Sequence, residues 1–176
     1  LVMQNNTLKD NYRGIILRSC FNSSFSNNLM ENCSFFLDSA STKANISPSN
    51  QVNGKPVRYY LEQENKTIDG SIMEIGQLMI VSSISLEIRN LEQIETSIGI
   101  FVFNSSQISL IDSNFSKNQY GALIDSTQNI LLNNCNFSDN SVHGLRLNNC
   151  TTASIIENTM SHNNGYGVDV KGGSNI

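Results

Sequence analysis

Acidic side chains are the first residues in this chain that could do chemistry, because enzymes that cleave glycosidic bonds place carboxylates on either side of that bond. The acids in the more regular half of the chain are scattered over several positions of its 22–23-residue repeat. No Asn-Thr-Asp, Asp-Asp or Gly-His-Gly sequence is present. We therefore predict no catalytic residue among these acids. The acids concerned are Asp112, Asp125, Asp139, Glu157 and Asp169.

A histidine and an arginine in the same region have simpler structural interpretations. His143 precedes a repeat glycine at the position that Tyr120 and Tyr166 hold in the neighbouring repeats, which indicates a ring packed in a turn. Arg146 and Asp169 both stand two residues after a repeat glycine, so we expect them to face each other on adjacent strands. An exposed ion pair of this kind contributes little to stability.

Sulfur and imidazole side chains could bind a transition metal such as copper. The chain has two histidines, His143 and His162, four cysteines and five methionines, but none in a Cys-x-x-Cys, His-x-His or Met-x-x-Met spacing. Met160 shares its repeat position with Phe115 and Phe137, which is typical of a core residue. We predict no metal site and no cofactor.

The four cysteines fall at two positions of the repeat. Cys33 and Cys135 share one position and Cys20 and Cys150 share the other, but each pair lies several repeats apart. Each repeat adds about 4.8 Å, and a disulfide needs Cα atoms within about 7 Å. This leaves two possible disulfides, Cys20–Cys33 and Cys135–Cys150, and a role as buried core thiols is equally compatible.

Nine Asn-x-Ser/Thr sequences could accept N-linked glycans if the chain is extracellular. The asparagine-rich composition accounts for most of them. Sites in turns are the better candidates, and we select Asn65, Asn104, Asn114, Asn136 and Asn149.

The elements that must position these residues follow from an internal repeat. Four marker glycines, Gly99, Gly121, Gly144 and Gly167, are spaced 22, 23 and 23 residues apart. After each glycine apolar residues alternate with others, which is the period of a strand with one buried face. Such repeats bury their apolar residues only by stacking on one another. The sequence therefore predicts an all-β, right-handed parallel β-helix of about seven rungs of 22–23 residues. One inward ladder should be Ile88, Leu110, Leu132 and Ile155.

The N-terminal half shows the same repeat less regularly. Gly14 is its marker glycine, with Ile15 and Leu17 as the inward pair. Residues 38–70 break the pattern, and we predict that they form a long excursion from one rung that partly covers the helix. Residues 1–176 should form one β-helix domain that is a fragment of a longer chain or a stacking unit.

Outward positions of one strand column carry an apolar patch. It contains Phe101, Phe103 and Leu123, whereas later rungs place charged or polar residues there. An apolar patch on a soluble rod is usually covered or is a binding surface. One possibility is that Tyr59 and Tyr60 of the excursion lie over it. The other is a partner, either a neighbouring subunit or a sugar ring stacked on a phenylalanine.

The segment from Asn53 to Ser106 resembles a known family. Its sequences NGKPVRYYLEQENKTIDG, IGQLMIVSSISLEIRNL and TSIGIFVFNSS are similar to NosD-type β-helix proteins, within the carbohydrate-binding and sugar-hydrolase (CASH) group that is abundant on methanogenic archaeal cell surfaces. The resemblance implies a right-handed β-helix outside the cytoplasm. It does not fix a function, because fold-level analogy is weak evidence for chemistry.

Charge and hydrophobicity argue against two classes of partner. The net charge of −4 argues against a nucleic-acid partner, which needs a basic face, and the chain has no run of 18 apolar residues that would insert into a membrane. We favour a non-catalytic cell-envelope module of the surface-layer, sheath or adhesin type, with self-association or neighbouring envelope subunits, and polysaccharide, as partners. The alternatives are a polysaccharide-active domain and a periplasmic NosD-like copper-site accessory protein.

Overall fold

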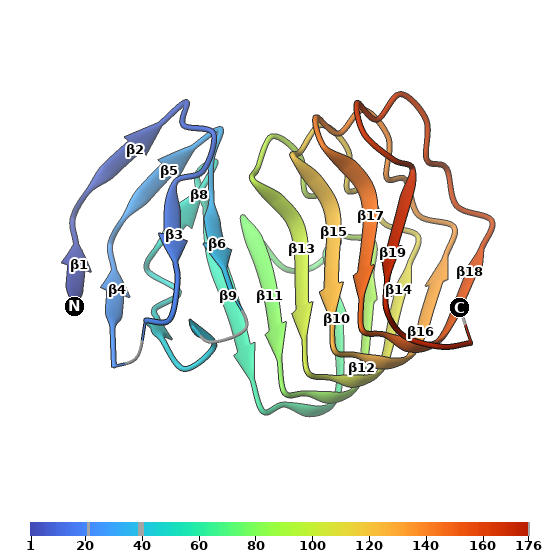
Figure 1. The fold of residues 1–176 in the computed structure, drawn as a ribbon. Helices are drawn as coiled ribbons and strands as arrows, with labels where there is room; N and C mark the ends of the chain where they lie inside the picture. The colour runs from blue at the N-terminus through green and yellow to red at the C-terminus, as the bar shows by residue number, and fades with distance from the viewer. Residues whose placement is uncertain (21, 39–40, 176) are drawn as a thin grey trace.

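The structure, a computed structural model, describes residues 1–20, 22–38 and 41–175. Within these residues it contains short β-strands and no α-helix (Figure 1). The strands stack as about 8 turns of a right-handed parallel β-helix. The predicted fold class is confirmed.

The first section of the β-helix comprises residues 1–53. It contains three columns of parallel strands, ordered β1-β4-β7, β2-β5-β8 and β3-β6. The strands are β1 (Val2–Gln4), β2 (Thr7–Lys9), β3 (Ile15–Leu17), β4 (Ser24–Ser26), β5 (Leu29–Glu31), β6 (Phe35–Leu37), β7 (Asn45–Ile46) and β8 (Gln51–Val52).

The second section, residues 54–175, is more regular and has two long columns. Strands β9, β11, β13, β15, β17 and β19 form one column, and β10, β12, β14, β16 and β18 form the other. Their bounds are β9 (Lys55–Leu61), β10 (Glu64–Asp69), β11 (Gln77–Val81), β12 (Ile84–Arg89), β13 (Ile98–Phe103), β14 (Ser106–Ile111), β15 (Tyr120–Asp125), β16 (Gln128–Asn133), β17 (His143–Asn148), β18 (Thr151–Ile156) and β19 (Val168–Lys171).

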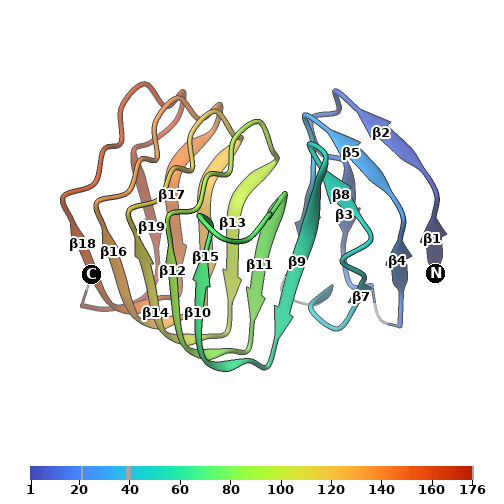
Figure 2. The same cartoon turned by 180° about the vertical axis from the view of Figure 1, so that it is seen from behind.

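The two sections share one continuous nine-stranded sheet, the long sheet, that runs from β2 to β19. They meet at β8 and β9, which form an antiparallel pair and lie side by side at the joint (Figure 2). Val52 of β8 points into the interior of the first section, and on the same face β9 carries Tyr59 toward the outside of the second section. The helix interior thus moves to the opposite face of the sheet. Because of that move, the strand direction must reverse at the joint for both sections to stay right-handed.

The predicted excursion over residues 38–70 is wrong. Its described residues are part of the wall: β7 and β8 complete the first section, and β9 and β10 form the first turn of the second. Residues 39 and 40 of this range lie outside the described residues. The 22–23-residue spacing is interrupted here because the strand direction reverses at the joint. Residues before and after the joint therefore do not occupy equivalent positions of one repeat.

Two hydrophobic clusters follow from this arrangement. The first fills the interior of the second section and contains the predicted ladder residues Ile88, Leu110 and Leu132, each fully buried. The second fills the first section and continues over the outer face of the second, where it includes Phe101 and Leu123.

The marker glycines stand where neighbouring turns approach most closely. A Cβ atom at Gly121 would lie 2.5 Å from the carbonyl oxygen of Gly144 and 2.8 Å from that of Phe115. A Cβ atom at Gly99 would lie 2.4 Å from the Gly121 carbonyl oxygen, and one at Gly144 would lie 2.7 Å from that of Gly167. The repeat spacing of these glycines therefore reflects backbone contact between turns.

Buried asparagine side chains link the turns to one another. In the second section Asn118 accepts the Thr96 amide through Oδ1 at 2.9 Å and donates through Nδ2 to the Gln93 carbonyl at 2.8 Å. Asn140 accepts the Asn118 amide at 2.8 Å and donates to the Phe137 carbonyl at 2.9 Å, and the half-buried Asn163 accepts the Asn140 amide at 2.9 Å. Each such amide satisfies backbone groups that would otherwise be buried without a partner.

We expect Asn118→Ala to lower the free energy of unfolding by about 2 kcal/mol, because it leaves the Thr96 amide and the Gln93 carbonyl without this partner. Urea denaturation of the variant measures the change. Gln128→Ala, at an exposed strand position, is the control and should change stability by less than about 0.5 kcal/mol. Equal effects of the two substitutions would contradict the stabilising role given to the buried asparagine side chains.

Candidate binding site on the outer face of the long sheet

The outward side chains of the long sheet form two columns. In register, Phe101 is followed by Leu123, Arg146 and Asp169. The second column runs from Phe103 through Asp125, Asn148 and Lys171. The change from apolar to charged residues along this face, which the sequence predicts, is confirmed by the strand register.

The first section covers the apolar part of this face. Phe101 is 3% exposed and Leu123 is 9% exposed, and the ring of Phe36 in β6 lies 6.2 Å from that of Tyr120. The covering strand is held by buried hydrogen bonds: the side-chain amide of Gln77 donates to the Phe35 carbonyl at 2.8 Å and accepts the Phe35 amide at 3.0 Å.

The two tyrosines predicted to cover the patch have other positions. Tyr59 belongs to the outward column itself, since it pairs in register with Met79, which pairs with Phe101. Its hydroxyl donates to the Thr42 carbonyl, and burial raises its pKa to about 12. Tyr60 instead packs against the interior of the second section, with the Lys66 ammonium 5.0 Å from its ring. Of the two possibilities for the patch, cover by these tyrosines is therefore contradicted by their positions.

A hollow remains where the cover ends, and we call it the β6 hollow. Its volume is about 250 Å³, smaller than the roughly 300–1,000 Å³ of sites for drug-sized ligands. Aromatic and aliphatic side chains form much of its lining, with carboxylates, an amide and a guanidinium among them. It is lined by Phe36, Leu37, Asp38, Phe101, Tyr120, Leu123, Asp125, Arg146 and Asn148.

The polar groups of the hollow differ in how many hydrogen bonds they already make within the protein. Asp38 accepts hydrogen bonds from the Ser19 amide and the Ser41 hydroxyl, which makes it part of a turn. Asp125 accepts one from the Ser126 hydroxyl through Oδ1. The Asn148 Oδ1 accepts one from Arg146 Nε at 3.2 Å. The second carboxylate oxygen of Asp125 and the Asn148 amide nitrogen are the groups best placed to bind a ligand.

Next to the hollow, an imidazole, a guanidinium and an ammonium group surround one carboxylate. Asp169 Oδ2 lies 3.4 Å from His143 Nε2, 3.5 Å from Arg146 Nε and 3.8 Å from Lys171 Nζ. The expected Arg146–Asp169 pair is therefore present, but it is not exposed: these two side chains are only 23% and 10% accessible.

His143 stacks in the turn as predicted. Its ring lies 5.2 Å from that of Tyr166 in a stacked arrangement and 5.7 Å from that of Tyr120 edge-on. Its Nδ1 accepts the Tyr166 amide at 3.0 Å, and its Nε2 faces Asp169. Both ring nitrogens are thus engaged within the protein, which leaves neither free to act as a general base.

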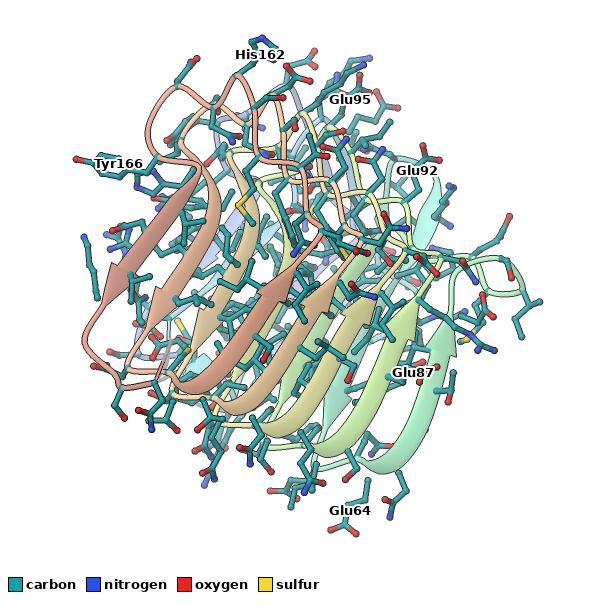
Figure 3. All side chains as sticks on the ribbon, turned by 90° about the vertical axis from the view of Figure 1, so that its right-hand side faces the viewer. Glu64, Glu87, Glu92, Glu95, His162 and Tyr166 are labelled. Atoms are coloured by element: carbon teal, nitrogen blue, oxygen red, sulfur yellow. The ribbon has the colours of Figure 1, made fainter. Side chains whose placement is uncertain are left out.

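Other acidic side chains do not converge on the hollow. Figure 3 shows Glu64, Glu87, Glu92 and Glu95 projecting from separate parts of the second section. His162 also projects from a turn, with Nδ1 3.8 Å from Asp139 Oδ1. In the described part of the chain, no three His, Cys, Asp or Glu side chains are close enough to hold a metal ion.

All four cysteines are free thiols, which favours the core-thiol interpretation over the two candidate disulfides. Cys33, Cys135 and Cys150 are buried and Cys20 is half-buried. Burial raises the pKa of Cys135 to about 11 and also raises the pKa values of Cys33 and Cys150.

We expect Cys20 to react with a thiol reagent first, and the three buried cysteines at least about tenfold more slowly, because the thiolate is the reactive form. Labelling of the native protein well below pH 11, followed by peptide mapping without reductant, measures both reactivity and pairing. A Cys20–Cys33 or Cys135–Cys150 linked peptide would contradict the structure.

The five candidate glycosylation sites separate into two groups. Asn65, Asn104 and Asn149 are exposed and have positive φ, Asn65 near the start of β10 and the other two in bends between strands. Asn114 and Asn136 are half-buried, and the Asn136 side-chain nitrogen donates to Asn114 Oδ1 at 3.1 Å. The first group is accessible for modification, and glycosylation itself stays a prediction.

The covering residues of β6 were missed by the sequence reasoning. Phe36, Leu37 and Asp38 are separated by more than sixty residues from the strands they face, and no repeat relation links them. One signal was present: three consecutive apolar residues, Phe35 to Leu37, indicate a strand with apolar contacts on both faces.

Comparisons with known proteins agree with this architecture. The model of a family described as a right-handed β-helix region matches residues 98–176, which include β13 to β19. Neither the curated proteins nor the solved structures gave a match. The match and the stacked strands together show a right-handed β-helix fold, and the match supports that part of the resemblance to NosD-type proteins. The described residues include no helix long and apolar enough to cross a membrane.

Proposed function

We propose that this chain is a non-catalytic module of an extracellular cell envelope, of the surface-layer, sheath or adhesin type. Its role is a rigid stacking scaffold. The observation that carries the proposal is the set of buried side-chain amides that link each turn to the next, as at Asn118 and Asn140. Buried polar networks of this kind, with their partners in place, rigidify a core.

The proposed scaffold also contacts carbohydrate at the β6 hollow. Tyr120 and Phe36 contribute apolar ring surface, and Asp125 and Asn148 contribute a hydrogen-bond acceptor and a donor. This is the combination that holds a sugar ring, because the ring presents C–H groups to an aromatic face and hydroxyls to polar side chains. The phenylalanines themselves, Phe101 and Phe103, serve as packing under the cover.

A glycan array probed with the purified chain tests the carbohydrate contact. Asp125→Asn and Asn148→Ala should reduce glycan binding at least about tenfold, which corresponds to about 1.4 kcal/mol of lost interaction, and should leave thermal melting unchanged. Ser109→Ala, on the outward side of the other sheet, is the matched control. Binding that is unaffected by either hollow variant would overturn the assignment of the site.

A polysaccharide-active domain is the second candidate, favoured by one observation. Asp38 and Asp125 line the same hollow, and hydrolysis of a glycosidic bond needs two carboxylates. A reducing-sugar assay on the glycans that bind separates the two functions. Binding without release of reducing ends supports the scaffold, whereas release that Asp125→Asn abolishes supports the enzyme.

The proposed partners are further envelope subunits or other copies of this chain. Light scattering across a concentration series measures self-association. A stable monomer at the highest soluble concentration would argue against self-stacking and leave other envelope subunits as the partners.

A further inference from the structure

The joint between the two sections is a two-residue turn of Asn53 and Gly54. Both residues are exposed, and both have positive φ, 49° at Asn53 and 76° at Gly54. A Cβ atom added at Gly54 would meet no heavy atom within 4 Å. The backbone on the C-terminal side of Asn53 is therefore sterically open.

The Asn53 side chain is a hydrogen-bonded link across this joint. Its Oδ1 accepts the amide of Asn32 in the first section at 2.9 Å. Its Nδ2 donates to the carbonyls of Ile94 and Glu95 in the second section, at 3.3 and 3.2 Å. One amide thus connects both sections.

We propose that Asn53 is a spontaneous deamidation site whose conversion loosens the first section from the second. The Gly54 backbone nitrogen attacks the Asn53 side-chain carbonyl carbon. A C–N bond forms, the bond to Nδ2 breaks, and ammonia leaves with the proton of the Gly54 amide. Water then opens the resulting succinimide at either carbonyl and gives aspartate or isoaspartate. The step needs no oxidant or other reagent, and the missing Cβ of glycine leaves the attacking nitrogen unhindered.

The product cannot make the original link. A carboxylate has no hydrogen to donate, so two acceptor oxygens would face the Ile94 and Glu95 carbonyls. Glu92 and Glu95 are among the residues that line the same cavity of about 210 Å³ as Asn53, and Lys55 is its one cationic lining residue, so the new negative charge adds to two acidic residues. Loss of the link removes one of the contacts that hold the first section, which covers Phe101 and Leu123, against the second.

The chain contains an internal control for the reaction. A second Asn-Gly sequence, Asn164-Gly165, lies in the last turn of the second section. There a Cβ position at Gly165 is 2.3 Å from the Val142 carbonyl and 2.5 Å from His143 Nδ1, so the backbone is closely packed. Peptide mapping of protein aged in mildly alkaline buffer should show acid and isoaspartate forms at Asn53 before Asn164. Conversion at Asn164 alone, or at neither site, would overturn the proposal.

Asn53→Asp and Asn164→Asp test the consequence. We expect Asn53→Asp to lower the Tm by about 3–8 °C and to increase amide hydrogen exchange in β3 and β6 about tenfold, whereas Asn164→Asp changes neither. The deamidated fraction of aged wild-type protein, separated by ion exchange, provides a second measurement that does not depend on folding of the variant. Exchange in β3 and β6 equal to that of the intact fraction would refute the loosening.

Discussion

Replacing Leu132 by asparagine will lower the free energy of unfolding by about 2–4 kcal/mol, because it combines lost apolar contacts with an amide that has no partner inside the helix. Leu132 is fully buried and pairs in register with Leu110 and Ile155 on the neighbouring turns. The variant should unfold at lower urea with an unchanged dependence on urea concentration.

Leu131 provides a matched control in the same strand. Its side chain points to the opposite face and is partly exposed. Leu131→Asn should cost less than about 1 kcal/mol, since it changes the same atoms without burying a polar group. Similar losses for the two substitutions would mean that the strand register is wrong.

The double substitution Phe101→Ser and Phe103→Ser will destabilise the protein by about 3–5 kcal/mol. Phe101 is buried beneath β6 and belongs to the cluster that joins the first section to the outer face of the second. The loss should be largest at this interface, so protease should cleave residues 1–53 first while the second section stays intact.

Ile84→Ser combined with Ile156→Ser is the comparison for this variant. These side chains are 46% and 47% exposed on the other sheet, and their replacement should shift stability by less than about 1 kcal/mol. A Phe101/Phe103 variant that melts as the wild type and loses assembly or glycan binding would restore the binding interpretation of the patch.

The sequence predicts the second section well because each turn there repeats the last. The marker glycines, the inward ladder through Leu132 and the stacking of His143 with its neighbouring tyrosines all follow from a 22–23-residue spacing. These features depend only on contacts between neighbouring turns, in which equivalent residues are separated by one repeat length.

The joint and the covered face could not be predicted in this way. The interior changes to the other face of the long sheet at β8–β9. The repeat spacing of residues in the sequence does not indicate such a change of face. The packing of Phe36 against Tyr120 joins distant segments that share no repeat position. Residues 38–70 therefore looked like an excursion, although their described part forms the wall of the helix.

The most direct test of the account is a nuclear Overhauser measurement between the rings of Phe36 and Tyr120. The central claim is that β6 of the first section packs against the outer face of the second section, over Phe101 and Leu123. The ring centroids lie 6.2 Å apart in the structure, and the account predicts cross-peaks between their edge protons. A spectrum in which Phe36 shows contacts only within residues 1–53 would contradict it.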